Sequence, residues 1–221
     1  MKSLFILFLL SFTVLNASFT QTTVSVNVQK NSSITINGTT NLLSFRLSQS
    51  GDKLTNRNFI VTAVQTKNKI ILSQNQHSIL VADFTSNNKM ALRDFLTLVK
   101  SNTYPAFHIQ LNYFEIQSNT DNVDFSKGNV SVNLTITGKT KKYNIPINSN
   151  HEGDLYTLNG TEKIDIRDFG LVPPIEMMGL IRVNEWINID FNIICKITSF
   201  KASPELNASN VIHSGNSDFS N

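Results

Sequence analysis

The stretch from Glu185 to Ile197, EWINIDFNIICKI, constrains the fold more than any other part of the sequence. Apart from one extra isoleucine, its apolar residues fall at every second position: Ile187, Ile189, Phe191, Ile193, Cys195 and Ile197. A period of two predicts a β-strand with one buried side and one solvent-facing side. A single strand of this length cannot cover its own apolar face or its backbone edge. The rest of the chain must therefore supply a closed or sandwiched antiparallel sheet.

Length and composition are those of one globular domain. The chain has 221 residues, of which 40% are hydrophobic and 16% are charged, and all-β domains of this size commonly form a single core. The 19 basic and 16 acidic residues give a formal charge of +3 and are scattered along the chain. Because no basic cluster could follow a phosphate backbone, we expect no nucleic-acid partner.

The N-terminus has the layout of a secretory signal peptide. Met1 and Lys2 precede an apolar run from Leu4 to Leu15, and small or polar residues follow it. The run is too short to serve as a permanent membrane anchor. We therefore predict a signal peptide at residues 1–20, a folded domain at 21–201 and a disordered polar tail at 202–221. The mature protein is expected to be periplasmic or secreted.

Reactive and metal-binding signatures are scarce. Cys195 is the only cysteine, so an internal disulfide is excluded, and its place in the apolar series predicts a packed side chain. The four histidines have no ligand-like spacing, so we expect no metal site. There is no phosphate-binding glycine loop, GxSxG elbow or HExxH motif. We expect neither a cofactor nor an enzymatic activity.

Strand patterns run through most of the chain, so the predicted class is all-β. We expect strands at residues 33–36, 43–47, 59–64, 69–72, 78–84, 107–113, 130–136, 143–147, 155–158 and 163–166. Turns are expected at 37–41, 137–140 and 159–160. One helix is expected at residues 88–99, with Leu92, Leu96 and Val99 on one face and a cap from residues 86–88.

The segment from Phe169 to Leu180, FGLVPPIEMMGL, does not fit a strand interior. Its prolines and apolar residues predict a loop that covers one end of the domain, near an entrance. Met177 and Met178 could form a flexible lid over an apolar ligand, or they could fill gaps in the core.

Several segments resemble the YceI-like, polyisoprenoid-binding family: the hairpin VNLTITGKTKKYNIPI, the strand and loop IDIRDFGLVPP, the sequence MGLIRVNEWINIDFNI, and the helix leading to TyrPro at 104 and 105. The resemblance extends over residues 24–200. It implies that the domain at 21–201 is an eight-stranded antiparallel, lipocalin-like barrel. In that family a long cavity receives an isoprenoid or fatty chain between apolar walls. Two positions depart from the family pattern, since Ile166 stands where the family often has an Arg and no His follows the Arg93–Asp94 pair.

An eight-stranded barrel can be filled by side chains or can hold one small ligand, and its wall residues decide which. The inward candidates here are almost all apolar. About ten buried CH₂ groups would contribute about 8 kcal/mol, which corresponds to about micromolar affinity at most. We therefore predict a carrier for an apolar small molecule, such as a polyisoprenoid, a quinone tail or a fatty acid. The alternative is a structural or interaction barrel with a filled core, and a homodimer is left open.

The predicted wall contacts are the inward apolar residues and the two methionines of the loop: Phe45, Phe107, Ile109, Val132, Leu134, Phe169, Met177, Met178, Ile189 and Phe191.

Overall fold

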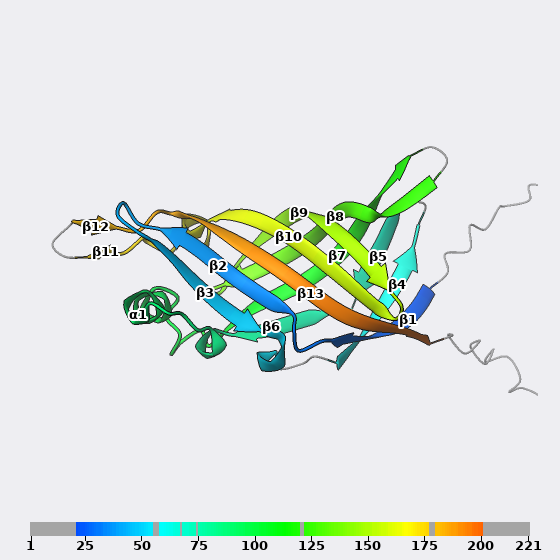
Figure 1. Ribbon diagram of the computed structural model, residues 1–221, viewed down its shortest axis with the longest axis horizontal. Coiled ribbons are helices and arrows are strands. Elements are labelled where there is room, and N and C mark those ends of the chain that lie inside the picture. The colour runs from blue at the N-terminus through cyan, green and yellow to red at the C-terminus, as the bar shows by residue number, and fades with distance from the viewer. Residues whose placement is uncertain are drawn as a thin grey trace, which may run out of the picture.

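The computed structural model describes residues 21–54, 58–66, 68–73, 75–119, 122–176 and 180–200. In this part the chain forms one elongated antiparallel barrel with a helix at one end (Figure 1). The predicted signal peptide and polar tail lie outside the described residues. Among the described residues, none of the helices has the length and apolar character needed to span a bilayer.

The predicted class, all-β with one α-helix, is confirmed. The strands are β1 (Gln21–Val28), β2 (Ser33–Thr39), β3 (Ser44–Ser50), β4 (Asn58–Gln65), β5 (Lys69–Ser73), β6 (Gln76–Leu80), β7 (Ala106–Asn119), β8 (Asn122–Ile136), β9 (Lys139–Glu152), β10 (Leu155–Asp165), β11 (Ile175–Glu176), β12 (Ile181–Arg182) and β13 (Trp186–Phe200). The helical segments are η1 (Gly51–Lys53), η2 (Val81–Asp83), α1 (Lys89–Leu98) and η3 (Ile166–Phe169).

Eight strands close the barrel in the order β1, β4, β5, β7, β8, β9, β10 and β13, and β13 pairs back onto β1. Two of these wall positions are built from two short strands in succession. Along β13, β2 pairs with residues 188–192 and β1 with residues 195–200. Along β7, β6 pairs with residues 106–110 and β5 with residues 113–115.

A buried polar side chain bridges each of these two breaks. The Ser32 hydroxyl accepts a hydrogen bond from the Ile194 N–H at 2.9 Å and donates one to its carbonyl at 3.1 Å. The Asn75 amide accepts from the Leu111 N–H at 2.7 Å and donates to its carbonyl at 2.8 Å. The two side chains thus supply the pairing that a strand residue would give, which keeps buried backbone groups satisfied.

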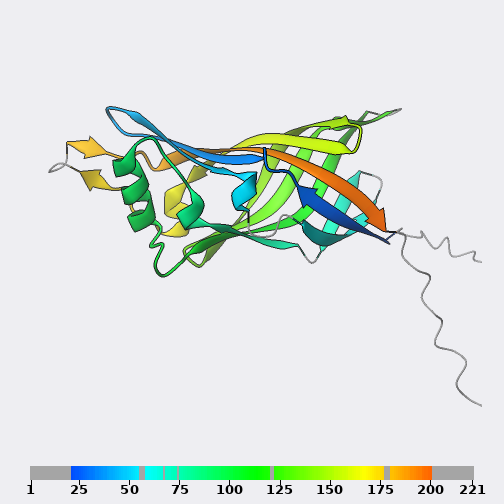
Figure 2. The same cartoon turned by 60° about the horizontal axis from the view of Figure 1, so that its bottom comes forward.

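The helix stands where strand pairing is interrupted. Between β3 and the segment after β6, the described residues form only the isolated bridge from Ser48 to Thr85. The α1 helix lies at this end of the barrel, together with β11 and β12 (Figure 2). Asn88 is the N-cap of α1, because its side chain accepts hydrogen bonds from the backbone N–H groups of Met90 and Ala91.

Two glycines that the sequence placed in turns lie inside strands: the turn predicted at 159–160 is wrong, and the turn predicted at 37–41 lies a few residues later, at 40–43. Gly160 is in the middle of β10, opposite Phe191 of β13, and a Cβ there would lie 2.8 Å from a ring carbon of Phe191. Gly38 is in β2, opposite Phe45 of β3, and its Cβ would lie 2.7 Å from a ring carbon of that residue. Both glycines therefore make room for a cross-strand ring.

Other local predictions fared unevenly. The turn at residues 137–140 is confirmed, because Thr137 and Gly138 adopt positive φ values of 47° and 78°. The strand expected at 78–84 ends at Leu80 and continues as the 3₁₀ turn η2. The predicted helix is confirmed, but its most enclosed residues are Phe95 and Val99, with Leu92 and Leu96 only partly buried.

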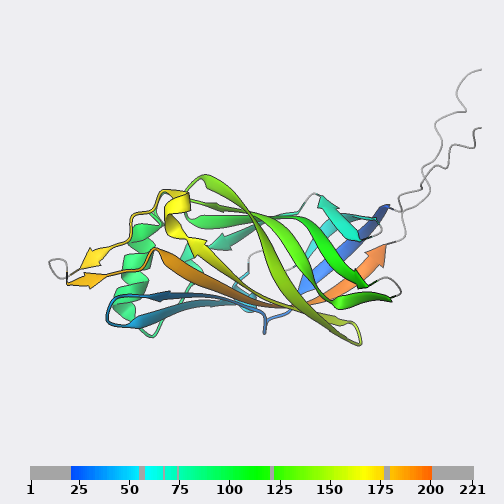
Figure 3. The same cartoon turned by 90° about the horizontal axis from the view of Figure 1, so that it is seen from above.

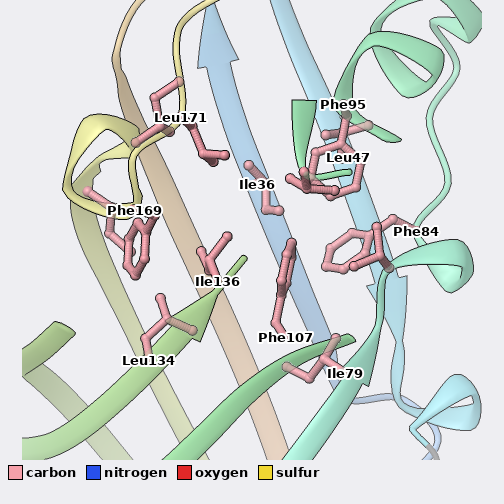
Figure 4. Close-up of a cluster of buried hydrophobic side chains, with 14 residues drawn as sticks. Ile36, Leu47, Ile79, Phe84, Phe95, Phe107, Leu134, Ile136, Phe169 and Leu171 are labelled. Carbon is pink, nitrogen blue, oxygen red and sulfur yellow. The ribbon is translucent and has the colours of Figure 1, made fainter. Parts of the chain in front are cut away.

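The interior contains two hydrophobic clusters. The helix-end cluster surrounds α1 and η3, and its buried members converge on one another (Figure 4): Ile36, Leu47, Ile79, Val81, Phe84, Phe95, Val99, Phe107, Leu134, Ile136, Ile164, Ile166, Phe169 and Leu171. The far cluster lies deeper along β8 and β9, and its buried members are Val130, Val132 and Ile147. Among the described side chains, buried apolar residues are thus more numerous at the helix end than along β8 and β9.

Candidate functional site

The barrel encloses a cavity of about 380 Å³. Its lining extends from Leu42 at the β2–β3 tip, past both hydrophobic clusters, to Phe114 of β7. The volume falls within the range of about 300–1,000 Å³ that small-molecule sites commonly have. The interior is therefore an apolar tunnel and not a filled core.

Most of the predicted wall residues lie on this tunnel. The residues that line it are Phe45, Phe107, Ile109, Val132, Leu134, Ile189 and Phe191. Phe169 is buried behind the wall, where its ring stacks on that of Tyr143 with the centroids 6.4 Å apart. Met177 and Met178 lie outside the described residues. Contact of any of these side chains with a ligand stays a prediction.

The apolar face of β13 forms one side of the tunnel. Four consecutive inward positions line it: Ile187, Ile189, Phe191 and Ile193. Cys195 continues the series as a buried side chain, and burial raises the pKa of its thiol to about 11. The prediction fails at Ile197, which is 39% exposed. The amphipathic pattern is thus correct over the part of the strand that faces the tunnel.

Two phenylalanine rings of the wall rest on glycines. Phe45 covers Gly38 and Phe191 covers Gly160, each across one ladder, and both rings line the tunnel. Glycine in a strand interior often marks such a close approach. Because neither glycine has a Cβ, each ring can lie flat against the sheet. A larger residue at either position would push the ring into the tunnel and narrow it.

Sequence patterns missed the lining that comes from irregular segments. Phe84 follows η2, and Phe95 lies on α1, and both line the tunnel beside Phe107. The ring centroids are 5.5 Å apart between Phe84 and Phe95, and 6.1 Å apart between Phe95 and Phe107. The spacing of apolar residues within the helix shows that one face is buried, but it does not show which strands that face meets.

A few polar groups interrupt the apolar wall. Within the described chain, His77 Nε2 is buried without a hydrogen-bond partner. Burial lowers the pKa of His77. Burial, followed by the nearby negative charges of Asp168, Glu162 and Asp165, raises the pKa of Tyr143 to about 12. Burial also raises the pKa of Glu162. Each of these shifts favours the uncharged form, so burial in the tunnel wall disfavours ionisation of these side chains.

The lining offers nothing to neutralise an anionic ligand deep inside. No lysine or arginine is among the described residues that line the tunnel. In the described part of the chain, no group of three or more His, Cys, Asp or Glu side chains could hold a metal ion. An ionic head group would therefore be poorly solvated in the interior, whereas a hydrocarbon chain would gain from leaving water.

The tunnel opens at the end where α1, β11 and β12 lie. Leu42 and Leu43 at the β2–β3 tip, Met90 of α1 and Ile181 of β12 all line it. Hydrogen bonds join the tip to β12, since Asn41 Nδ2 donates to the Leu180 carbonyl at 2.9 Å and Asn41 Oδ1 accepts from the Arg182 N–H at 2.9 Å. The predicted covering loop is therefore a short β11–β12 hairpin beside the opening.

Comparison with known proteins agrees with this geometry. A model of the YceI-like domain matches residues 9–195. The structure is similar to that of a polyisoprenoid-binding domain from Saccharophagus degradans implicated in plant cell wall breakdown. That likeness has a TM-score of 0.52 at 10% identity and covers 79% of this chain and 98% of the other. No curated protein matches the chain.

Two further solved structures are more distantly similar. BcnA of Burkholderia cenocepacia has a TM-score of 0.42 at 15% identity, covering 78% of this chain and 95% of the other. A YceI protein of Campylobacter jejuni has a TM-score of 0.41 at 16% identity, covering 59% of this chain and 74% of the other.

Proposed function

The chain belongs to the YceI-like family, and from this premise we propose that it binds one long apolar chain inside its barrel. A polyisoprenoid, a quinone tail or a fatty acid fits the proposal. The protein would act as a carrier in the periplasm or outside the cell, without catalysing a reaction.

The observation that carries this proposal is the tunnel itself. It is about 380 Å³ in volume, and its lining is apolar with few exceptions. Water gains no hydrogen bonds in an apolar cavity, whereas each CH₂ group of a ligand buried there contributes about 0.8 kcal/mol to the binding free energy. The competing structural role requires a filled core, which the tunnel argues against. The similarity to a polyisoprenoid-binding domain supports the same ligand class.

The first test is to fill the tunnel by substitution. Ile189→Trp adds a large side chain to an inward position of β13, whereas Asn188→Trp adds the same side chain to its exposed neighbour. Uptake of a fluorescent polyene fatty acid should fall at least about tenfold in Ile189→Trp, because overlap with the chain removes several buried CH₂ groups. Uptake by Asn188→Trp should match that of the unchanged protein.

The second test looks for a natural ligand. Native mass spectrometry of the protein purified from its own host should show a bound lipid whose mass is removed by organic extraction. The proposal fails if no lipid co-purifies and the unchanged protein takes up no added polyisoprenoid or fatty chain. Equal uptake by the two tryptophan variants would place the binding site outside the tunnel.

A further inference from the structure

Six large apolar side chains at the helix end are exposed to solvent, by 52% to 78%, and are called the rim: Leu42, Leu43, Met90, Val172, Ile175 and Leu180. They belong to the β2–β3 tip, the first turn of α1 and the segments around β11 and β12. These elements gather at one end of the barrel in every view (Figure 3). Contiguous exposed apolar residues of this kind mark an interaction surface.

The rim is continuous with the tunnel. Leu42, Leu43 and Met90 are exposed on the outside and also line the cavity. A largely apolar surface therefore continues from the outer end of the barrel into its interior. A partner that merely held the protein in place would not require this continuity, whereas a source of apolar ligand would.

Basic residues flank the apolar residues of the rim. Lys89 directly precedes Met90, and Arg182 lies in β12 between the apolar residues Ile181 and Val183. Glu176 of β11 is the acidic residue of the hairpin. Apolar side chains with basic neighbours are typical of proteins that rest on a bilayer, where the apolar groups enter the acyl boundary and the cations meet phosphate groups.

We propose that the rim docks on the surface of a lipid bilayer, so that an apolar chain passes between membrane and tunnel without crossing water. This inference rests on the proposed function, because only a chain-binding barrel needs such a route. The charged or polar head of the chain stays at the rim, since the tunnel lining has no lysine or arginine in the described residues. Lys89 and Arg182 are basic residues next to rim or tunnel-lining residues in the sequence.

Trp186, the only tryptophan of the chain, reports on docking. It is the first residue of β13. Its backbone N–H donates a hydrogen bond to Asn184 Oδ1, and the Asn184 backbone N–H donates one to the Thr39 carbonyl of β2. These bonds join the start of β13 to the end of β2, and the indole is 43% exposed, with the Lys163 ammonium 4.9 Å from its ring centroid. Added vesicles of phosphatidylethanolamine and phosphatidylglycerol should shift its emission to shorter wavelength. Vesicles of phosphatidylcholine alone should give a smaller shift.

A matched pair of triple variants tests the location. Val172→Ser, Ile175→Ser and Leu180→Ser together remove rim side chains that do not line the tunnel. Ile60→Ser, Ile71→Ser and Leu155→Ser together remove residues that are 41% to 61% exposed on β4, β5 and β10. The rim variant should bind vesicles at least about tenfold more weakly in a flotation assay, because burying one such side chain in the bilayer raises the affinity roughly tenfold. The control variant should bind like the unchanged chain.

Uptake of a fluorescent polyene fatty acid from solution separates the two proposals. The expected result is normal uptake by the rim variant together with weak vesicle binding. If the unchanged protein takes up the fatty acid but neither floats with vesicles nor shifts its emission, docking is overturned and the carrier role stands. If it floats without taking up any chain, the carrier role fails. Equal loss of vesicle binding in both triple variants overturns the assignment to the rim.

Discussion

The helix-end cluster and the far cluster line the same tunnel but are built differently. The helix-end cluster has 14 buried apolar residues, and aromatic rings of β7, α1 and the segment after η2 meet edge to face within it. Among the residues whose side chains are described, the far cluster has three buried members and includes the half-buried Phe191, whose ring lies over Gly160. At the helix end the side chains pack against one another, whereas the members of the far cluster are mostly partly buried residues.

The difference follows from how each end of the wall is closed. Around the far cluster, backbone ladders join neighbouring strands, and at the break beside Leu111 the side chain of Asn75 supplies the pairing. At the helix end, β3 and the segment after β6 share a single described bridge, and side-chain packing by α1 completes the wall. In this barrel the larger buried cluster lies where α1 stands in for strand pairing between β3 and the segment after β6.

The largest expected effect tests this contrast directly. Phe107→Ala removes a ring that packs against both Phe84 and Phe95, and it should lower the free energy of unfolding by about 3–5 kcal/mol. Phe191→Ala removes a half-buried ring and should cost roughly half as much. Urea unfolding of both variants checks the ratio. Equal losses would mean that the two clusters stabilise the fold alike.

The next prediction concerns the C-terminal part of β13, where Cys195 is buried. The folded chain retains the thiol proton up to a pKa of about 11, while the unfolded chain loses it near the ordinary value of 9.0. The folded state therefore binds more protons between these values, and the free energy of unfolding should fall by roughly 2–3 kcal/mol as pH rises through this window. Cys195→Ala should lack this part of the pH dependence. An identical decline in both proteins would show that this region is open to solvent.

Gly160 sharpens the contrast with a smaller effect on stability. Gly160→Ala should push the Phe191 ring into the tunnel, with a cost of about 1 kcal/mol and a marked loss of fatty-acid uptake. Adding Phe191→Leu should restore uptake, because the shorter side chain clears the new methyl group. If the double variant binds no better than Gly160→Ala, the glycine does not act through the ring.

The smallest effect is expected on the outer face of α1. Arg93 bonds to Asp94 at 3.1 Å, and the arginine side chain is mostly exposed. Such pairs contribute little, so Arg93→Ala should change the free energy of unfolding by less than about 0.5 kcal/mol. Phe95→Ala on the inner face should cost several times more by the same urea measurement. The reverse order would mean that the ion pair holds the helix in place.

Alternating patterns in the sequence predicted the strands and most of the wall. They worked along most of β7, β8 and β13 because one side of each strand faces the tunnel, although Ser131 on the opposite side of β8 is fully buried. They failed at Gly38 and Gly160, where local composition indicated a turn. The requirement for glycine there comes from a ring on the neighbouring strand, and no local pattern encodes it. The contribution of Phe84 and Phe95 was missed for the same reason, since their positions are set by tertiary packing.

The side chains of Ser32 and Asn75 give the barrel an unusual distribution of amide protection. The amide hydrogens of Ile194 and Leu111, on long strands at the centre of the sheet, are held by a hydroxyl and a side-chain amide and not by backbone carbonyls. Their exchange with deuterium is therefore controlled by single side chains. Ser32→Ala or Asn75→Ala should release one central proton selectively, while neighbouring amides keep their slow exchange.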